Sequence, residues 1–210
     1  FTNISNAPYI SESPHSNLNI YFVKNYSFKN ELSEFLKDNK FDLLHGHGIW
    51  QMPVHYMAQL ARKANIPYII TPHGMLEPWS LSQRKWKKKL ALALYQGKDL
   101  ANASCIHATS KMEACNIRKL GFTNPIAMIP NGIDVSEYPL KDHSTNSGKK
   151  TILFLSRIHL KKGIELLIEA WSQLDSKIRS NWKLEIAGNG DESYIQSIQK
   201  LINRSLLESE

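Results

Sequence analysis

Short apolar runs alternate with longer amphipathic segments along the chain, and this alternation constrains the fold more than any other feature. The runs have the length of strands, and most are rich in β-branched or aromatic residues. The segments between them repeat their apolar residues with the period of a helix. Strands that alternate with helices in this way are typical of helices wrapped on a parallel sheet, so the sequence predicts an α/β protein.

The same patterns place individual elements. Strands are expected at about 19–23, 41–45, 67–71, 104–108, 126–129, 151–155 and 183–187. Helices are expected at about 30–38, 54–63, 82–95, 111–120, 164–174 and 192–203. Ser110 and Glu113 have the spacing of a capping box, in which the Glu113 side chain reaches back to the helix start. Gly121 suits the left-handed residue that ends the same helix.

A polar stretch without periodicity, 141–150, separates two strand–helix series, so we interpret it as an interdomain linker. Residues 1–140 are expected to form a first domain, and residues 151–210 to begin a second. About 60 residues are marginal for an independent α/β domain, so we expect the second domain to be incomplete. The first residues lack Met and a basic segment before an apolar core, so we expect a cut-off start without a secretory signal.

Composition narrows the class of protein. A hydrophobic content of 42% is that of an ordinary globular chain. The apolar runs are far shorter than the roughly 20 residues that cross a bilayer. The two cysteines, Cys105 and Cys115, suit free thiols in a cytosolic protein better than a disulfide framework. We therefore expect a cytoplasmic protein without a transmembrane helix.

One segment holds most of the excess positive charge. The formal net charge is +7, and five positive charges lie together at Arg84, Lys85, Lys87, Lys88 and Lys89. On a helix, Trp86 and Leu90 would share an apolar face with Ala93 and Leu94. Such a helix favours docking on anionic lipid, with Arg84, Lys85, Trp86, Lys87 and Lys88 as the candidate membrane contacts. The alternative is that the apolar face packs on the domain core and the lysines are solvated.

The segment 155–163 leaves a strand expected to be buried and enters a helix at Ile164. Amides at a helix start carry partial positive charge and bind anions. Arg157 and Lys162 on the same loop could clamp a diphosphate from two sides. The alternative is a solvated basic loop with a glycine at its turn.

This segment resembles the Arg-x4-Lys-Gly signature of retaining glycosyltransferases of family 4. Three further segments resemble motifs of that family and follow its order: T-P-H-G at 71–74, I-P-N-G-I-D at 129–134 and A-G-N-G at 187–190. The resemblance implies a GT-B type protein, with a Rossmann-like parallel-sheet acceptor domain and the first part of a Rossmann-like donor domain. It also implies a nucleotide-sugar donor, a glycan or lipid-linked acceptor, transfer with retention, and no metal or other cofactor.

By the same resemblance, Arg157 and Lys162 would neutralise the departing nucleotide diphosphate. His73 would lie beside the donor sugar at the reaction centre, although a histidine in such a turn can also be structural. Five residues would belong to loops at the donor cleft: Asn131, Gly132, Asp134, Gly188 and Gly190.

His45 and His47 lie in the sequence H-G-H-G-I-W at a predicted strand end. His47 and Trp50 are expected to line an acceptor pocket, where the aromatic face of Trp50 could stack on a sugar. An alternating histidine pair could also suggest zinc. No Cys or carboxylate cluster with ligand spacing accompanies it, so no metal site is expected.

Two motifs of the family have no match here: a glycine-rich loop after the first strand, and an E-x7-E segment that would follow Glu210. We therefore expect truncation at both ends and negligible transfer by these residues alone. Family habit suggests bacterial surface polysaccharide or lipopolysaccharide synthesis. The alternative is a non-catalytic GT-B remnant that binds a membrane or a partner. Nucleic-acid binding rests on charge alone and is not expected.

Overall fold

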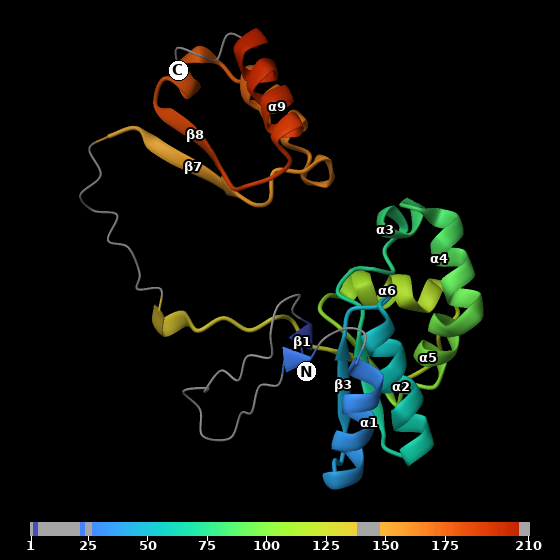
Figure 1. The fold of residues 1–210 in the computed structure, drawn as a ribbon. Coiled ribbons are helices and arrows are strands. Elements are labelled where there is room, and N and C mark those ends of the chain that lie inside the picture. Colours follow the sequence, from blue (N-terminus) through green and yellow to red (C-terminus); the bar gives the residue numbers. More distant parts are fainter. Residues whose placement is uncertain (1, 4–21, 24–26, 138–147, 206–210) are drawn as a thin grey trace. The chain divides into compact units, whose positions relative to one another are not determined.

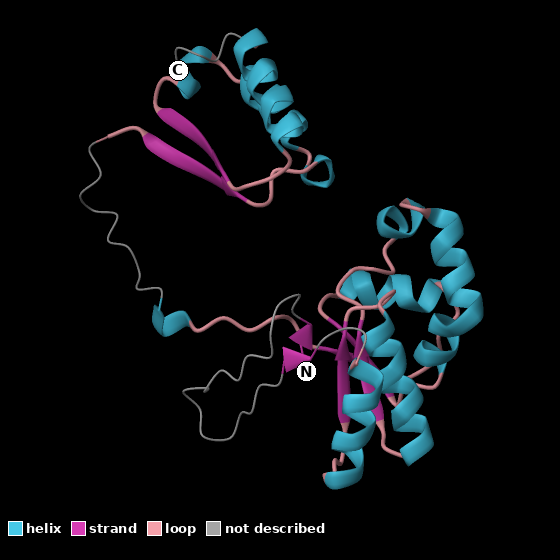
Figure 2. Ribbon diagram, in the orientation of Figure 1, coloured by secondary structure: helices cyan, strands magenta, loops and turns pink. Residues whose placement is uncertain are grey.

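The computed structural model describes residues 2–3, 22–23, 27–137 and 148–205. The chain divides into two compact units, Phe1–Ile133 and Asp134–Glu210. This division falls before the expected linker at 141–150, of which residues 141–147 lie outside the described residues. Figure 2 shows strands and helices in both units.

A parallel sheet of four strands forms the centre of the first unit (Figure 1). Its order is β3-β4-β5-β6, and the strands are Leu44–His47, Tyr68–Thr71, Cys105–Ala108 and Ile126–Met128. Because all four run in the same direction, their carboxyl ends meet at one edge of the sheet. The predicted parallel α/β class is confirmed. Most of the strand expected at 19–23 lies outside the described residues, and β2 (Phe22–Val23) pairs with β1 (Thr2–Asn3).

Three predicted helices of this unit are confirmed within a few residues, as α1 (Phe28–Asp38), α2 (Met52–Ala64) and α6 (Lys111–Lys119). Helix α2 packs on α1 and β3, and α6 packs on β5 and β6. The core between helices and sheet includes Ala58, Ile70, Ile106, Ala108 and Ile117, all fully buried. These are the positions that the strand and helix periods point inward.

The start of α6 differs from the expected capping box in one bond. The Ser110 hydroxyl accepts from the Glu113 amide at 3.2 Å, as predicted. The Glu113 carboxylate binds Thr109, the residue before the cap, instead of the Ser110 amide. Gly121 has the predicted left-handed backbone, with φ +90°.

The helix expected at 82–95 is found over 85–95, but it differs from the expectation at its start and in its period. Helix α3 (Pro78–Ser82) ends early, Arg84 takes a left-handed φ of 50°, and three continuous pieces follow. These are α4 (Lys85–Ala91), the π-helix η1 (Leu92–Gln96) and α5 (Gly97–Ala101). A π-turn adds one residue to a helix and so shifts the faces that follow it. Here Gln96, at the end of the π-helix, and Asp99 and Leu100, just after it, are completely buried.

The second unit has a parallel pair of strands, β7 (Lys150–Leu155) and β8 (Trp182–Ala187). The short helices η2 (Val135–Glu137), η3 (Leu160–Lys162) and α8 (Ser176–Arg179) accompany the longer α7 (Ile164–Ser172) and α9 (Glu192–Arg204). Side chains of α7 and α9 form a small core with Phe154 and Ile186 of the strands.

The expectation that β7 is buried is wrong. Leu153 is 57% exposed and Leu155 is 75% exposed. Successive side chains of a strand point to opposite faces, and Phe154 points to the face that carries the core. Among the described residues the core of this unit lies on that face only, so Leu153 and Leu155 stay exposed.

Candidate functional site

Histidines gather at the carboxyl edge of the first sheet. Nδ1 of His47, the last residue of β3, lies 2.9 Å from Nε2 of His73, which follows β4. Their rings stack with centroids 5.2 Å apart, and the His45 ring lies 4.3 Å from that of His47. The structure thus brings together His47, which the sequence assigned to the acceptor pocket, and His73, which it assigned to the donor sugar. Both side chains are exposed at the sheet edge.

A second chain of bonds ties the same strand ends together. Nε2 of His45 lies 2.7 Å from Oγ1 of Thr71, which lies 2.9 Å from Nδ1 of His107. Nε2 of His107 lies 2.8 Å from the carbonyl oxygen of Ile129. A carbonyl can only accept, so His107 donates from Nε2. With neutral rings, Nδ1 of His107 then accepts from the Thr71 hydroxyl, which in turn accepts from Nε2 of His45.

Sequence reasoning did not single out Thr71 or His107 as members of this site. The available signal was that each lies at or near the carboxyl end of a predicted strand, where parallel sheets place ligands. Their bonds connect β3, β4 and β5 to Ile129, the first residue of the segment I-P-N-G-I-D.

The electrostatics favour a neutral imidazole at His45 and at His47. Partial burial lowers the pKa of His45, and the neighbouring His47, His107 and His73 lower it further. Partial burial also lowers the pKa of His47, followed by the effects of His73 and His107. A neutral imidazole can donate from one nitrogen and accept at the other, which suits binding to sugar hydroxyls.

His73 has an unusual backbone. It occupies a turn in which the Met75 amide donates to the Pro72 carbonyl at 3.2 Å. His73 and Gly74 both have positive φ, at 53° and 72°, as the central residues of a type I′ turn do. A left-handed conformation is uncommon for residues other than glycine, and such residues concentrate at functional sites.

Trp50 also has a positive φ, 73°, and is half-buried against the core. Its amide donates to Oε1 of Gln96 at 3.0 Å, and Nζ of Lys88 lies 5.6 Å from its ring centroid. Within the described residues the buried indole Nε1 has no hydrogen-bond partner. The predicted acceptor role of Trp50 remains a prediction.

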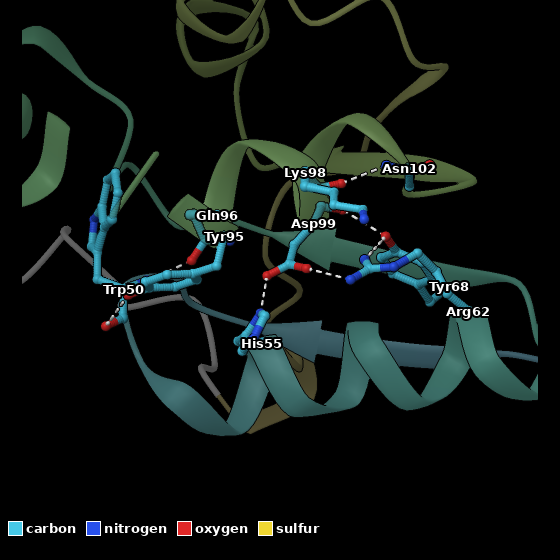
Figure 3. A network of polar contacts seen from close by, with 9 residues as sticks. All are labelled: Trp50, His55, Arg62, Tyr68, Tyr95, Gln96, Lys98, Asp99 and Asn102. Atoms are coloured by element: carbon cyan, nitrogen blue, oxygen red, sulfur yellow. Dashed lines mark hydrogen bonds and ion pairs between the residues drawn. The ribbon is translucent and has the colours of Figure 1, made fainter. Parts of the chain in front are cut away.

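A buried polar network braces the same part of the unit (Figure 3). The carboxylate of Asp99, fully buried, accepts from Nδ1 of His55 at 2.7 Å and from Nη2 of Arg62 at 2.9 Å. The Tyr68 hydroxyl donates to the Asp99 carbonyl at 2.7 Å and accepts from Nη1 of Arg62 at 2.9 Å. The network joins α2, β4 and α5, and no sequence motif marked it.

The helical segment α4–η1 exposes its apolar residues. Trp86 is 68% exposed, Leu90 51% and Leu94 70%, so the alternative in which this face packs on the core is wrong. Of the five clustered cations, Lys88 is the half-buried one. It donates to the Ser80 carbonyl at 2.5 Å. The other four are exposed: Arg84, Lys85, Lys87 and Lys89.

In the second unit, two glycines shape the loop that carries Arg157. The Ile158 amide donates to the Asn189 carbonyl at 2.8 Å, which lays this loop along the A-G-N-G segment. A Cβ on Gly188 would lie 1.7 Å from the Ser156 carbonyl oxygen, and one on Gly190 would lie 2.1 Å from that of Ile158. Both positions therefore require glycine because the two backbones approach so closely.

The two predicted diphosphate ligands are both exposed and lie at opposite ends of one short connection. Arg157 follows β7, and Lys162 ends η3. Gly163, with φ 66°, then starts α7. Among the described residues, the Arg157 guanidinium and the Lys162 ammonium form no hydrogen bond or ion pair. Both groups therefore remain accessible to an anion.

The segment I-P-N-G-I-D is exposed throughout. Oδ1 of Asp134 accepts from the Ser136 amide at 2.9 Å and from its hydroxyl at 2.6 Å. The hydroxyl bond and then the amide bond lower the pKa of Asp134. A Cβ on Gly132 would meet nothing within 4 Å, so packing does not explain this glycine. The predicted donor-site roles of Asn131, Gly132 and Asp134 remain predictions.

The described residues contain no group of three or more His, Cys, Asp or Glu placed to hold a metal ion. In the same part of the chain no helix is both long and apolar enough to span a bilayer. Cys105 and Cys115 are free thiols.

Comparison with protein families decides the identity. The family model described as Glycosyltransferase Family 4 matches residues 8–137, and the one described as Glycosyl transferases group 1 matches residues 139–207. The chain belongs to glycosyltransferase family 4. Within this family 4 chain, the first model covers the histidine cluster and the second covers the loop with Arg157 and Lys162.

Solved structures share the fold of this family 4 chain. Alr3699/HepE from Anabaena, determined in complex with UDP, matches with a TM-score of 0.66 at 19% identity, over 86% of this chain and 49% of that one. An α,α-trehalose-phosphate synthase (UDP-forming) from Burkholderia xenovorans, in complex with glucose-6-phosphate, matches with a TM-score of 0.58 at 11% identity, over 99% and 62%. These likenesses establish the α/β GT-B type fold.

A curated relative from Arabidopsis thaliana is one of the subunits of a phosphatidylinositol N-acetylglucosaminyltransferase. It is 24% identical over 155 residues, which cover 74% of this chain and 34% of the relative. The family 4 chain thus spans about a third of that relative and about half of HepE.

Proposed function

We propose that this chain is part of a glycosyltransferase that moves a sugar from a nucleotide-sugar donor to a glycan or lipid-linked acceptor, with retention at the anomeric carbon. One observation carries the proposal: two exposed cations, Arg157 and Lys162, on a loop whose path depends on Gly188 and Gly190. The UDP held by HepE and the UDP-forming reaction named for the trehalose-phosphate synthase support a nucleotide donor. A role in bacterial surface polysaccharide or lipopolysaccharide synthesis is part of the proposal.

The residues divide the chemistry between them. Arg157 and Lys162 place two positive charges against the diphosphate, which stabilises the charge that develops as the nucleotide leaves. His73, bonded to His47, supplies a hydrogen bond to the donor sugar. Charge neutralisation by a guanidinium and an ammonium requires no metal ion or other cofactor.

The test measures the binding of UDP to the chain by NMR titration. Arg157→Ala and Lys162→Ala should each remove a charge-assisted contact of about 1.5–3 kcal/mol, which is roughly 10- to 150-fold in dissociation constant. Lys200→Ala removes an exposed charge from α9 and serves as the matched control. An equal UDP affinity in all four proteins would refute the diphosphate site.

We further propose that the segment α4–η1 attaches the protein to the anionic surface of a membrane, on the cytoplasmic side. Trp86, Leu90 and Leu94 follow one another at intervals of four residues and are exposed. Exposed basic residues flank them, and this combination is typical of interfacial helices. A surface of this kind would suit an acceptor carried on lipid.

Sedimentation with vesicles tests the attachment. Each basic residue near an anionic surface contributes about 1 kcal/mol, so the double variant Lys85→Ala/Lys87→Ala should weaken binding to phosphatidylglycerol vesicles by roughly 30-fold. The double variant Lys111→Ala/Lys119→Ala removes two exposed charges of α6 and should bind as the unmodified chain does. Vesicle binding that changes neither with the loss of these lysines nor with added salt would refute the proposal. Vesicle binding without any UDP affinity would favour the non-catalytic module.

A further inference from the structure

Glu113 is a buried carboxylate with an unusual division of its bonds. It lies in the first turn of α6 and is 2% exposed. Oε2 accepts from the amide and the hydroxyl of Thr109, at 2.8 and 2.9 Å. Oε1 accepts from the Gly74 amide at 2.6 Å, across 39 residues of sequence. Both oxygens therefore act as acceptors, and the helix start adds a favourable field for negative charge.

Helix capping explains only one of these oxygens. The Ser110 hydroxyl already accepts from the Glu113 amide, and Oε2 binds the residue before the cap. Oε1 leaves the helix altogether and holds a turn that follows β4. A carboxylate that served only to cap α6 would gain nothing from Gly74, so the bond to Gly74 requires a separate explanation.

The bond acts on the peptide unit that joins His73 to Gly74. This unit lies inside the turn from Pro72 to Met75, where both central residues have positive φ. The turn's own bond, from the Met75 amide to the Pro72 carbonyl, is 3.2 Å long, whereas the bond to Glu113 is 2.6 Å and goes to a charged acceptor. Bonds to charged groups are roughly twice as strong as neutral ones. Fixing this peptide plane restrains the ψ angle of His73 and so helps to set the direction in which its side chain leaves the backbone.

We propose that Glu113 is a positioning residue, whose carboxylate holds the His73 turn so that the His73 ring meets His47. The strained φ of His73 persists because an external acceptor over-determines it. The importance of this contact for sugar transfer rests on the role proposed above for His73, whereas the positioning itself does not.

NMR of the 210-residue chain tests the positioning directly. In the unmodified chain the Gly74 amide proton should resonate far downfield and exchange slowly, although Gly74 lies in a half-buried turn. Glu113→Gln keeps the shape of the side chain and removes the charge, so the Gly74 proton should move upfield and the ring ¹⁵N signals of His47 and His73 should shift. Amides of α9 serve as the internal reference.

A matched variant separates positioning from general destabilisation. Thr109→Val removes the hydroxyl bond to Oε2 and leaves Oε1 on Gly74, so it should lower the melting temperature without moving the signals of Gly74 or His73. Unshifted Gly74 and His73 signals in Glu113→Gln would overturn the proposal. If Glu113→Gln does not fold, rapid exchange of the Gly74 amide in the unmodified chain would overturn it equally well.

The consequence for transfer is measured separately, in a transfer-competent form of the protein. Glu113→Gln should lower kcat by more than tenfold with little change in the donor KM, because the diphosphate contacts lie in the other unit. Shifted NMR signals with an unchanged kcat would support the positioning by Glu113 and refute the proposed role of His73. Weak UDP binding would bear on Arg157 and Lys162 and leave this inference untouched.

Discussion

Nδ1 of His47 lies 2.9 Å from Nε2 of His73, and 26 residues of sequence separate the two. A hydrogen bond between imidazole nitrogens needs one donor and one acceptor, so at least one ring is neutral while the bond exists. Protonating both rings would turn two N–H groups toward each other. The hydrogen bond between His47 and His73 therefore cannot form when both rings carry a proton.

Acid should weaken the first unit. Burial and neighbouring histidines lower the pKa of His45 and His47 below the ordinary value of 6.5. An unfolded chain then binds protons more readily than the folded one, so the stabilisation is fully present above about pH 6.5 and is lost as the pH falls through the lowered pKa values. Urea unfolding between pH 8 and pH 5 measures this loss. His47→Gln should make the unfolding free energy depend less on pH. His159→Gln, in the other unit, should leave this dependence unchanged.

The Asp99 network should be among the most sensitive parts of the first unit. Asp99→Asn removes the charge that faces the Arg62 guanidinium inside the protein and should cost about 3 kcal/mol of unfolding free energy. Tyr68→Phe removes only a hydroxyl from the same network and should cost about 1 kcal/mol. Urea unfolding of both variants gives the two values, and equal costs would contradict the role of the buried charge.

The glycines of the A-G-N-G segment should tolerate no side chain. Gly188→Ala and Gly190→Ala each place a Cβ within about 2 Å of a carbonyl oxygen, and each should cost more than about 2 kcal/mol. Gly148→Ala meets nothing within 4 Å and should change stability by less than about 0.5 kcal/mol. Thermal unfolding monitored by the Trp182 signal reports on this unit. A neutral Gly188→Ala would show that the close approach of the two backbones is wrong.

Alkali should weaken the second unit. Burial, followed by a hydrogen bond to Glu165, raises the pKa of Tyr194 to about 12. The folded state therefore holds its phenol proton more tightly than the unfolded chain, so the stabilisation is present below about pH 10 and is lost as the pH rises through about 12. Tyr194→Phe should remove this part of the pH dependence, as followed by circular dichroism.

Short-range patterns predicted most of the fold. Apolar runs located the strands, and the rule that parallel strands end at one edge placed His73 at that edge. The helix-end signals at Ser110 and Gly121 were also correct, apart from the Glu113 carboxylate, which binds Thr109, because these signals depend on residues a few positions apart. The motif assigned Gly188 to a loop at the donor cleft, but it did not predict the nearness of the Ser156 carbonyl, which requires glycine at this position.

Contacts between distant residues could not be predicted. Asp99 meets Arg62 and His55 across 37 and 44 residues, and no spacing rule connects them. The bond from Gly74 to Glu113 escaped notice for the same reason. The helix expected at 82–95 differs for another reason: a constant period of 3.6 residues was assumed, whereas the chain breaks at Arg84 and inserts a π-turn at Leu92–Gln96.

The π-turn at Leu92–Gln96 makes this helix sensitive to length more than to composition. Each residue of a helix turns the chain by about 100°. Deleting one residue from the turn would restore a regular helix and rotate everything on one side of it. Either the exposed Trp86 and Leu90 would be driven inward, or Asp99 would be swung away from Arg62. Homologous proteins that keep both faces must therefore keep the extra residue, even where every side chain in the turn has been replaced.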